Sequence, residues 1–147
     1  MQPSVKNNLL HCLVMLNSSA KTMFYVRDYD DPWEFYHAGN QAPFDAAQML
    51  LGVIGEQIPK LVESLKLRHA HIPWRQIRSV RNIIFHDYSG VDYREIFRII
   101  KQELPVFKHQ LDTLIRSEWV DGNFDRTEIE LVRGNEFYRF IDFDVIL

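Results

Sequence analysis

The chain has 147 residues, a length typical of one domain. With 46% hydrophobic and 25% charged residues, the composition is that of an ordinary globular domain and excludes disorder as the main interpretation. No apolar run approaches the ~20 residues of a membrane span, and residues 1–8 lack the apolar stretch of a secretory signal. Cys12 is the only cysteine and can form no internal disulfide, so we expect a reducing, cytoplasmic compartment. The net charge of −3 taken over the whole chain argues against a nucleic-acid binder.

The whole-chain charge averages over two segments of opposite sign. Residues 66–86 hold five basic side chains and no acid: Lys66, Arg68, Arg75, Arg78 and Arg81. Residues 117–147 reverse the balance, with eight acids against three arginines. A local basic cluster is typical of a phosphate-binding surface, although such a cluster is more often a solvated helix face.

The first 67 residues predict two long helices. Apolar side chains recur at three- and four-residue steps over residues 4–26, as on one face of a helix. Residues 28–43 are rich in Asp, Pro, Gly and Asn and predict a loop or a broken helix. A second helix is expected from residue 43 or 45 to about 67, kinked at Pro59. Gly52 and Gly55 lie inside it, and we attribute them to close packing between helices.

Two further helices and a different tail follow. A third helix is expected over residues 73–88, with Pro73 in its first turn, and a fourth over 91–116, interrupted at Pro105. Residues 127–132 and much of 137–147 alternate polar and apolar, with Gly134 and Asn135 between them, which indicates a short C-terminal β-hairpin. We therefore divide the chain into a helical domain, residues 1–116, and an acidic C-terminal extension, residues 117–147.

A helical wheel of the third helix separates two kinds of arginine. Arg75, Arg78, Asn82 and His86 form a polar column at steps of three, four and four residues. Arg81 instead falls in the middle of the apolar side. Because a buried guanidinium needs a partner, Arg81 should meet an acid, an interface or a substrate phosphate. Arg81 and His86 point about 140° apart on a regular helix, so two copies across a twofold axis, or a bend at the helix end, would be needed to close them on one atom.

The segment that runs from Ile72-Pro-Trp-Arg to Ser89-Gly-Val-Asp92 closely resembles the HepT-like toxins of the HEPN superfamily. Their Arg-x4-His-x-Tyr signature is filled here by Arg81, His86 and Tyr88. Ile54-Gly55-Glu56 resembles the family's Ile-Gly-Glu, and Glu103-Leu104-Pro105 its Asp/Glu-Leu-Pro; the resemblance covers about residues 46–114. Met49 and Gly52 stand where the family usually has Arg and Glu, and the tail lies outside the family pattern.

This resemblance implies an all-α fold, a HEPN-type antiparallel helical bundle that dimerises through its motif helices. It implies a metal-independent endoribonuclease toxin that cleaves RNA at a composite dimer site, with Arg81 and His86 as catalytic residues. It also implies a partner, a minimal nucleotidyltransferase antitoxin of the MntA type, which silences the toxin by transferring AMP to Tyr88. The alternative is a non-catalytic adaptor that presents Tyr88 to that nucleotidyltransferase.

The remaining polar residues receive supporting roles. An imidazole has an ordinary pKa of ~6.5, which suits His86 to general acid or base catalysis, and Arg81 would stabilise charge on the phosphoryl oxygens. Asn82 would be auxiliary. Arg75, Arg78, Lys66 and Arg68 would hold RNA phosphates without reading sequence.

We expect no cofactor and no metal. His69 and His71 lack a third ligand at usable spacing, so phosphate contact or solvent exposure is favoured for them. The acidic tail could cover the basic cleft of a neighbouring copy or form an oligomer contact. The alternative, that it packs on its own bundle, is slightly favoured.

Overall fold

The computed structural model describes residues 5–87 and 90–147, and all regular structure in this part of the chain is helical, which confirms the predicted all-α fold. In chain order the α-helices are α1 (Asn8–Val26), α2 (Pro32–His37), α3 (Ala42–Gln57), α4 (Glu63–Arg68), α5 (Trp74–His86), α6 (Tyr93–Arg98), α7 (Leu104–Val120), α8 (Ile129–Val132) and α9 (Phe143–Ile146). The shorter 3-10 and π-helical elements are Ala38–Gln41, Ile58–Lys60, Ile99–Glu103, Arg126–Glu128 and Glu136–Tyr138.

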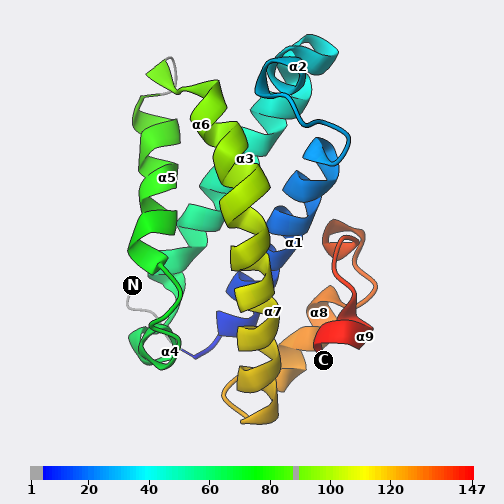
Figure 1. The fold of residues 1–147 in the computed structure, drawn as a ribbon. Helices are drawn as coiled ribbons and strands as arrows, with labels where there is room; N and C mark the ends of the chain where they lie inside the picture. The colour runs from blue at the N-terminus through cyan, green and yellow to red at the C-terminus, as the bar shows by residue number, and fades with distance from the viewer. Residues whose placement is uncertain (1–4, 88–89) are drawn as a thin grey trace.

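The four longer helices α1, α3, α5 and α7 run alternately up and down the bundle (Figure 1). Helix α1 packs on α3 and α7, and α3 carries α5 on its other side. Fully buried leucines such as Leu13, Leu61 and Leu111 fill the centre. Helix α5 lies at the edge of the bundle and buries only Ile84 completely, so most of its surface is free to meet another molecule.

Pro59 divides the predicted second helix, whereas the interruption expected at Pro105 does not occur. Pro59 has no N–H to donate, and the backbone leaves the helical region at Leu61 and Val62, where ψ is 141° in both. One predicted helix thus becomes α3 and α4. Pro105 lies in the first turn of α7, and the π-helical stretch Ile99–Glu103 precedes it, so the chain there stays helical.

Gly52 and Gly55 lie where α3 meets α5, which confirms the predicted close packing between helices. A Cβ atom added to Gly55 would lie 2.4 Å from the Cβ of Arg81, and one added to Gly52 would lie 2.3 Å from the Cζ of Phe85. Real Cβ atoms do not approach so closely. The two glycines therefore set the separation of the helix that carries the motif from the helix behind it.

The C-terminal hairpin prediction is wrong for the described tail, which forms short helical turns instead. Three polar residues of the tail accept hydrogen bonds from backbone N–H groups two residues onward. Asp125 accepts from Thr127 N at 3.1 Å, Asn135 from Phe137 N at 2.9 Å and Asp142 from Asp144 N at 3.1 Å. Such side-chain caps compete with strand pairing and begin helical turns.

The tail packs on its own bundle. The buried Asn17 of α1 donates to Phe137 O at 2.8 Å and accepts from Phe140 N at 3.2 Å. Glu128 accepts from Asn7 N at the start of α1, at 2.6 Å. Helix α7 itself runs to Val120 and so passes through the domain boundary expected after residue 116.

No helix among residues 5–87 and 90–147 combines the length and apolar character needed to cross a membrane.

Candidate functional site

The polar column predicted on α5 faces outward. Arg75, Arg78, Asn82 and His86 are all exposed, at the spacing that places them on one side of the helix. In the part of the chain that the structure describes, the side chains of Arg75, Arg78 and His86 make no hydrogen bond or ion pair. Helix α5 also contains no Asp or Glu that could pair with Arg75 or Arg78. Three of the four members of the column, Arg75, Arg78 and His86, are therefore left without a partner among the described residues, while Asn82 is bonded to Arg81, and a phosphate could bind to these three groups.

Arg81 meets an acid, the first of the three partners that the sequence allowed. Its Nε donates to Oε1 of Glu56 on α3 at 2.5 Å, and its Nη1 donates to Oδ1 of Asn82 at 3.1 Å. The guanidinium also lies 5.2 Å from the ring centroid of Phe85. The side chains of Arg81 and Glu56 are 30% and 39% exposed, so the pair is open to solvent and within reach of a ligand.

Lys66 and Arg68 lie at the opposite end of α5 from His86, beyond a helix of 13 residues that spans about 20 Å. Lys66 Nζ donates to Ile58 O at 3.3 Å and pairs with Glu63. The structure therefore places these two residues at the end of α5 where the column begins with Arg75, far from His86.

Arg68 is held by Glu118, a carboxylate from α7 that is only 1% exposed. Arg68 binds both carboxylate oxygens, at 2.9 and 3.1 Å, His69 Nε2 lies 2.8 Å from one of them, and Asn123 donates to the other at 2.6 Å. Burial opposes the charge of Glu118, but the hydrogen bonds from Arg68, Asn123 and His69 outweigh it and lower the pKa of this carboxyl. The cluster ties the end of α4 to the end of α7.

No group of three or more His, Cys, Asp or Glu side chains in the described ranges has a metal-binding arrangement. His69 is bonded to Glu118, and His71 is exposed beside it, with ring centroids 6.1 Å apart. Cys12 is fully buried in the core, and burial raises the pKa of its thiol, which favours the packing role.

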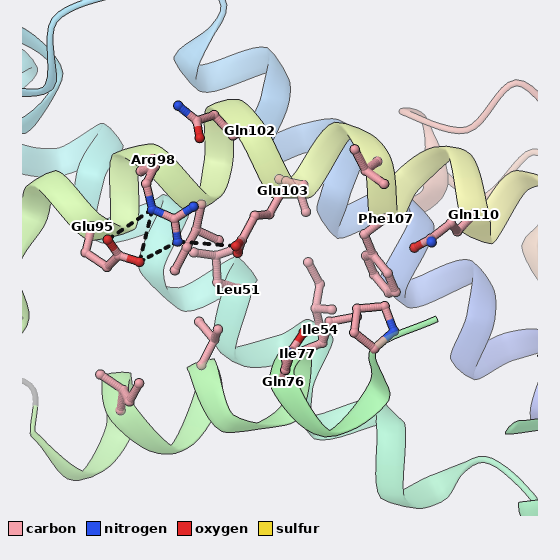
Figure 2. Close-up of a pocket in the computed structure, with 16 residues that line it drawn as sticks. Leu51, Ile54, Gln76, Ile77, Glu95, Arg98, Gln102, Glu103, Phe107 and Gln110 are labelled. Atoms are coloured by element: carbon pink, nitrogen blue, oxygen red, sulfur yellow. Dashed lines mark hydrogen bonds and ion pairs between the residues drawn. The ribbon is translucent and has the colours of Figure 1, made fainter. Parts of the chain in front are cut away.

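A groove of about 490 Å³ runs along the other flank of α5 (Figure 2). Its apolar floor and walls come from α3, α5 and the stretch that leads from α6 into α7: Leu51, Ile54, Ile77, Val80, Ile83, Ile99, Leu104, Val106 and Phe107. At its rim Arg98 bonds both Glu95 and Glu103, so this charge is already satisfied. Ile83 and Val106 both line the groove and remain 54% and 58% exposed, so part of its apolar lining faces solvent.

Sequence reasoning missed two residues of this region. Glu56 was noted only as part of a motif, although the wheel position of Arg81 demanded an acid and Glu56 is the acid near the end of the preceding helix. Glu118 carried no local signal, because it lies 50 residues from Arg68 in the sequence. Tyr88, the expected site of AMP transfer, lies outside the described residues. Met49, which stands where the resemblance led us to expect a polar residue, is exposed.

The family model "Ribonuclease HepT-like" matches residues 24–114, more than half of the chain. No solved structure matches significantly.

Three curated relatives illustrate the similarity. "Putative RNase TTE0752" of Caldanaerobacter subterraneus is 32% identical over 46% of this chain and 61% of its own length. "Putative RNase MJ1216" of Methanocaldococcus jannaschii is 31% identical over 52% of this chain and 64% of its own length. "Probable ribonuclease HepT" of Thermococcus cleftensis is 33% identical over 44% of this chain and 58% of its own length. The chain thus spans about three fifths of each relative that it matches, and from the family match it belongs to the HepT-like family.

Proposed function

We propose that the protein is an endoribonuclease that acts without a metal ion, and that it is the toxin of a type VII-like toxin–antitoxin pair. The observation that carries this proposal is the outward column Arg75, Arg78, Asn82 and His86, whose three cationic or titratable members have no partner in the described part of the chain. Arg81, held by Glu56, lies next to it. The HepT-like family match supports the same activity.

The chemistry needs a base, an acid and a cation that stabilises charge. The ribose 2′-hydroxyl attacks the adjacent phosphorus and passes its proton to His86 of one copy. The bond from phosphorus to the 5′-oxygen breaks, and this oxygen takes a proton from His86 of the second copy. The products are a 2′,3′-cyclic phosphate and a 5′-hydroxyl. Arg81 stabilises the negative charge that grows on the phosphoryl oxygens, and Asn82 orients the phosphate or the histidine.

Arg75 and Arg78 would hold the RNA backbone on either side of the cleaved bond. Their contacts are electrostatic and carry no sequence information, so affinity should fall steeply with salt. Lys66 and Arg68 already form ion pairs within the chain, and these ion pairs would have to break before either residue could bind a phosphate. We therefore assign the phosphate contacts first to the column.

A second copy would complete the site, and the groove beside α5 is where we place it. The groove is lined mainly by apolar side chains, and Arg98 at its rim is already paired with Glu95 and Glu103. Because the groove adjoins the polar column, two copies that meet here would bring their two columns close together. Ile83→Lys would put a charge on the exposed apolar rim. We expect this variant to be monomeric by light scattering and to lose RNA cleavage while staying folded; a dimeric, active Ile83→Lys protein would remove the groove as the interface.

Silencing by the antitoxin would act at Tyr88. The phenol oxygen attacks the α-phosphorus of ATP, pyrophosphate leaves, and AMP stays on the side chain. Tyr88 follows His86 by two residues, so the added bulk and negative charge would stand beside the cleft and repel RNA phosphate. We propose an MntA-type nucleotidyltransferase as the enzyme that performs this transfer.

The decisive experiment compares RNA cleavage by the wild-type protein and by His86→Ala, with Asp112→Asn on α7 as a folded control. We expect cleavage by the wild type and the control and none by His86→Ala, with cyclic phosphate ends on the products. Equal cleavage by His86→Ala would overturn the assignment. A stable complex with the nucleotidyltransferase, AMP on Tyr88 by intact mass and no RNA cleavage by any form would favour the adaptor instead.

A further inference from the structure

Arg81 is held on two sides before any substrate arrives. Its Nε–H points at Glu56 Oε1, 2.5 Å away across the α3–α5 interface, and one Nη1–H points at Asn82 Oδ1, 3.1 Å away on its own helix. The ring of Phe85 lies 5.2 Å from the guanidinium. A guanidinium has five N–H groups, so the rest of its Nη1 and Nη2 edge remains available for a phosphate.

The position of Glu56 follows from the close approach of the two helices. Gly55 directly precedes it, and its Cα faces Arg81 so closely that an added Cβ would lie 2.4 Å from the Cβ of that residue. The backbone of α3 is therefore in contact with the root of the arginine side chain. From there the short glutamate side chain reaches Nε and fixes the direction in which the guanidinium leaves α5.

An anion beside a phosphate-binding arginine has two opposing effects. It reduces the net positive charge, so it weakens ground-state binding of RNA. It also removes most of the rotational freedom of a long side chain, so less entropy is lost when the transition state forms. Glu56 is half-exposed and paired, and its charge is not needed to satisfy any other group that the structure describes.

We propose that Glu56 is a positioning residue, which holds the guanidinium of Arg81 in the orientation that meets the phosphoryl oxygens. This inference rests on the proposed ribonuclease function. Glu56 touches no reacting atom in this scheme and acts only through Arg81.

The kinetic test uses Glu56→Ala and Glu56→Gln, because glutamine keeps an acceptor oxygen for Nε and loses only the charge. We expect Glu56→Ala to lower kcat about tenfold to a hundredfold, the cost of a misplaced catalytic group, with KM unchanged or lower. Glu56→Gln should recover most of kcat. The matched control is Asp112→Asn, which removes another half-buried carboxylate paired with a lysine, Lys108 at 3.3 Å, and should leave both constants unchanged.

A second readout follows the arginine itself and needs no activity. The Nε–H signal of Arg81, identified by its loss in Arg81→Lys, should exchange slowly with solvent in the wild type and in Glu56→Gln, and rapidly in Glu56→Ala. This measurement separates the two proposals. If the protein cleaves no RNA, or if His86→Ala cleaves it as well as the wild type does, the function fails while the exchange data still report whether Glu56 holds Arg81.

Three results would overturn the inference. The first is a rapidly exchanging Arg81 Nε–H in the wild type. The second is an unchanged kcat in Glu56→Ala, or a raised KM at unchanged kcat, which would make Glu56 a binding residue. The third is a Glu56→Gln protein as slow as Glu56→Ala with an equally lowered Tm, which would assign Glu56 to the fold alone.

Discussion

Replacing each of the two α3 glycines by alanine tests the packing that positions the motif helix. Both substitutions place a methyl group within 2.4 Å of α5, but they meet different neighbours. Gly55→Ala strikes the Cβ of Arg81, which cannot move without the backbone of α5. Gly52→Ala strikes the tip of the Phe85 ring, and that side chain is 40% exposed and can swing outward.

The two variants should therefore differ in stability. An alanine in a helix gains about 1 kcal/mol over glycine. Overpacking costs about 1–3 kcal/mol, and the upper part applies where the neighbour is fixed to the backbone. We expect Gly55→Ala to lose about 2 kcal/mol of unfolding free energy, and Gly52→Ala to change by less than about 0.5 kcal/mol because the gain in helix propensity offsets a small displacement of the ring.

The assay is urea unfolding followed by circular dichroism at 222 nm, with all variants at one protein concentration so that any association affects them equally. Gly55→Ala should have a lower midpoint with an unchanged slope. Its rate of RNA cleavage should also fall by more than the loss of folded protein explains, because the methyl group pushes Arg81 away from Glu56. Equal stability of the two variants, or a Gly55→Ala protein more stable than the wild type, would refute the close approach of α3 and α5.

Three further outcomes follow from the structure. Ending the chain after Val120 should lower Tm and expose the core to a hydrophobic dye, because the tail covers α1 and α7; an unchanged Tm would show that the tail is a separate extension. The lowered pKa of Glu118 means that its stabilisation is complete above its unfolded pKa, about 4.5, and is lost as pH falls below it, so Glu118→Gln should flatten the acid limb of a Tm-against-pH curve. Arg75→Ala and Arg78→Ala should each weaken RNA binding and reduce by about 1 the slope of log affinity against log salt, measured by fluorescence anisotropy; an unchanged slope would remove the phosphate contact.

The charge cluster read from the sequence proved to contain two kinds of residue. Arg75 and Arg78 extend outward and are unpaired in the described ranges, as the local helical spacing predicted. Lys66 and Arg68 occur in the same acid-free segment, yet their partners Glu63 and Glu118 lie outside it, and Glu118 comes from 50 residues away. Counting acids within a segment misses Glu63, which lies three residues before Lys66 and just outside the segment, and Glu118, which only the fold brings near.

The sequence alone determined what depends on spacing along one helix. It separated the column of Arg75, Arg78, Asn82 and His86 from the inward Arg81, because 3.6 residues per turn fix which side chains share a face. Tertiary structure decided which acid meets Arg81 and that the tail forms capped turns on its own bundle. Those outcomes depend on contacts between distant segments and on local caps that outcompete strand pairing, and no periodicity records either of them.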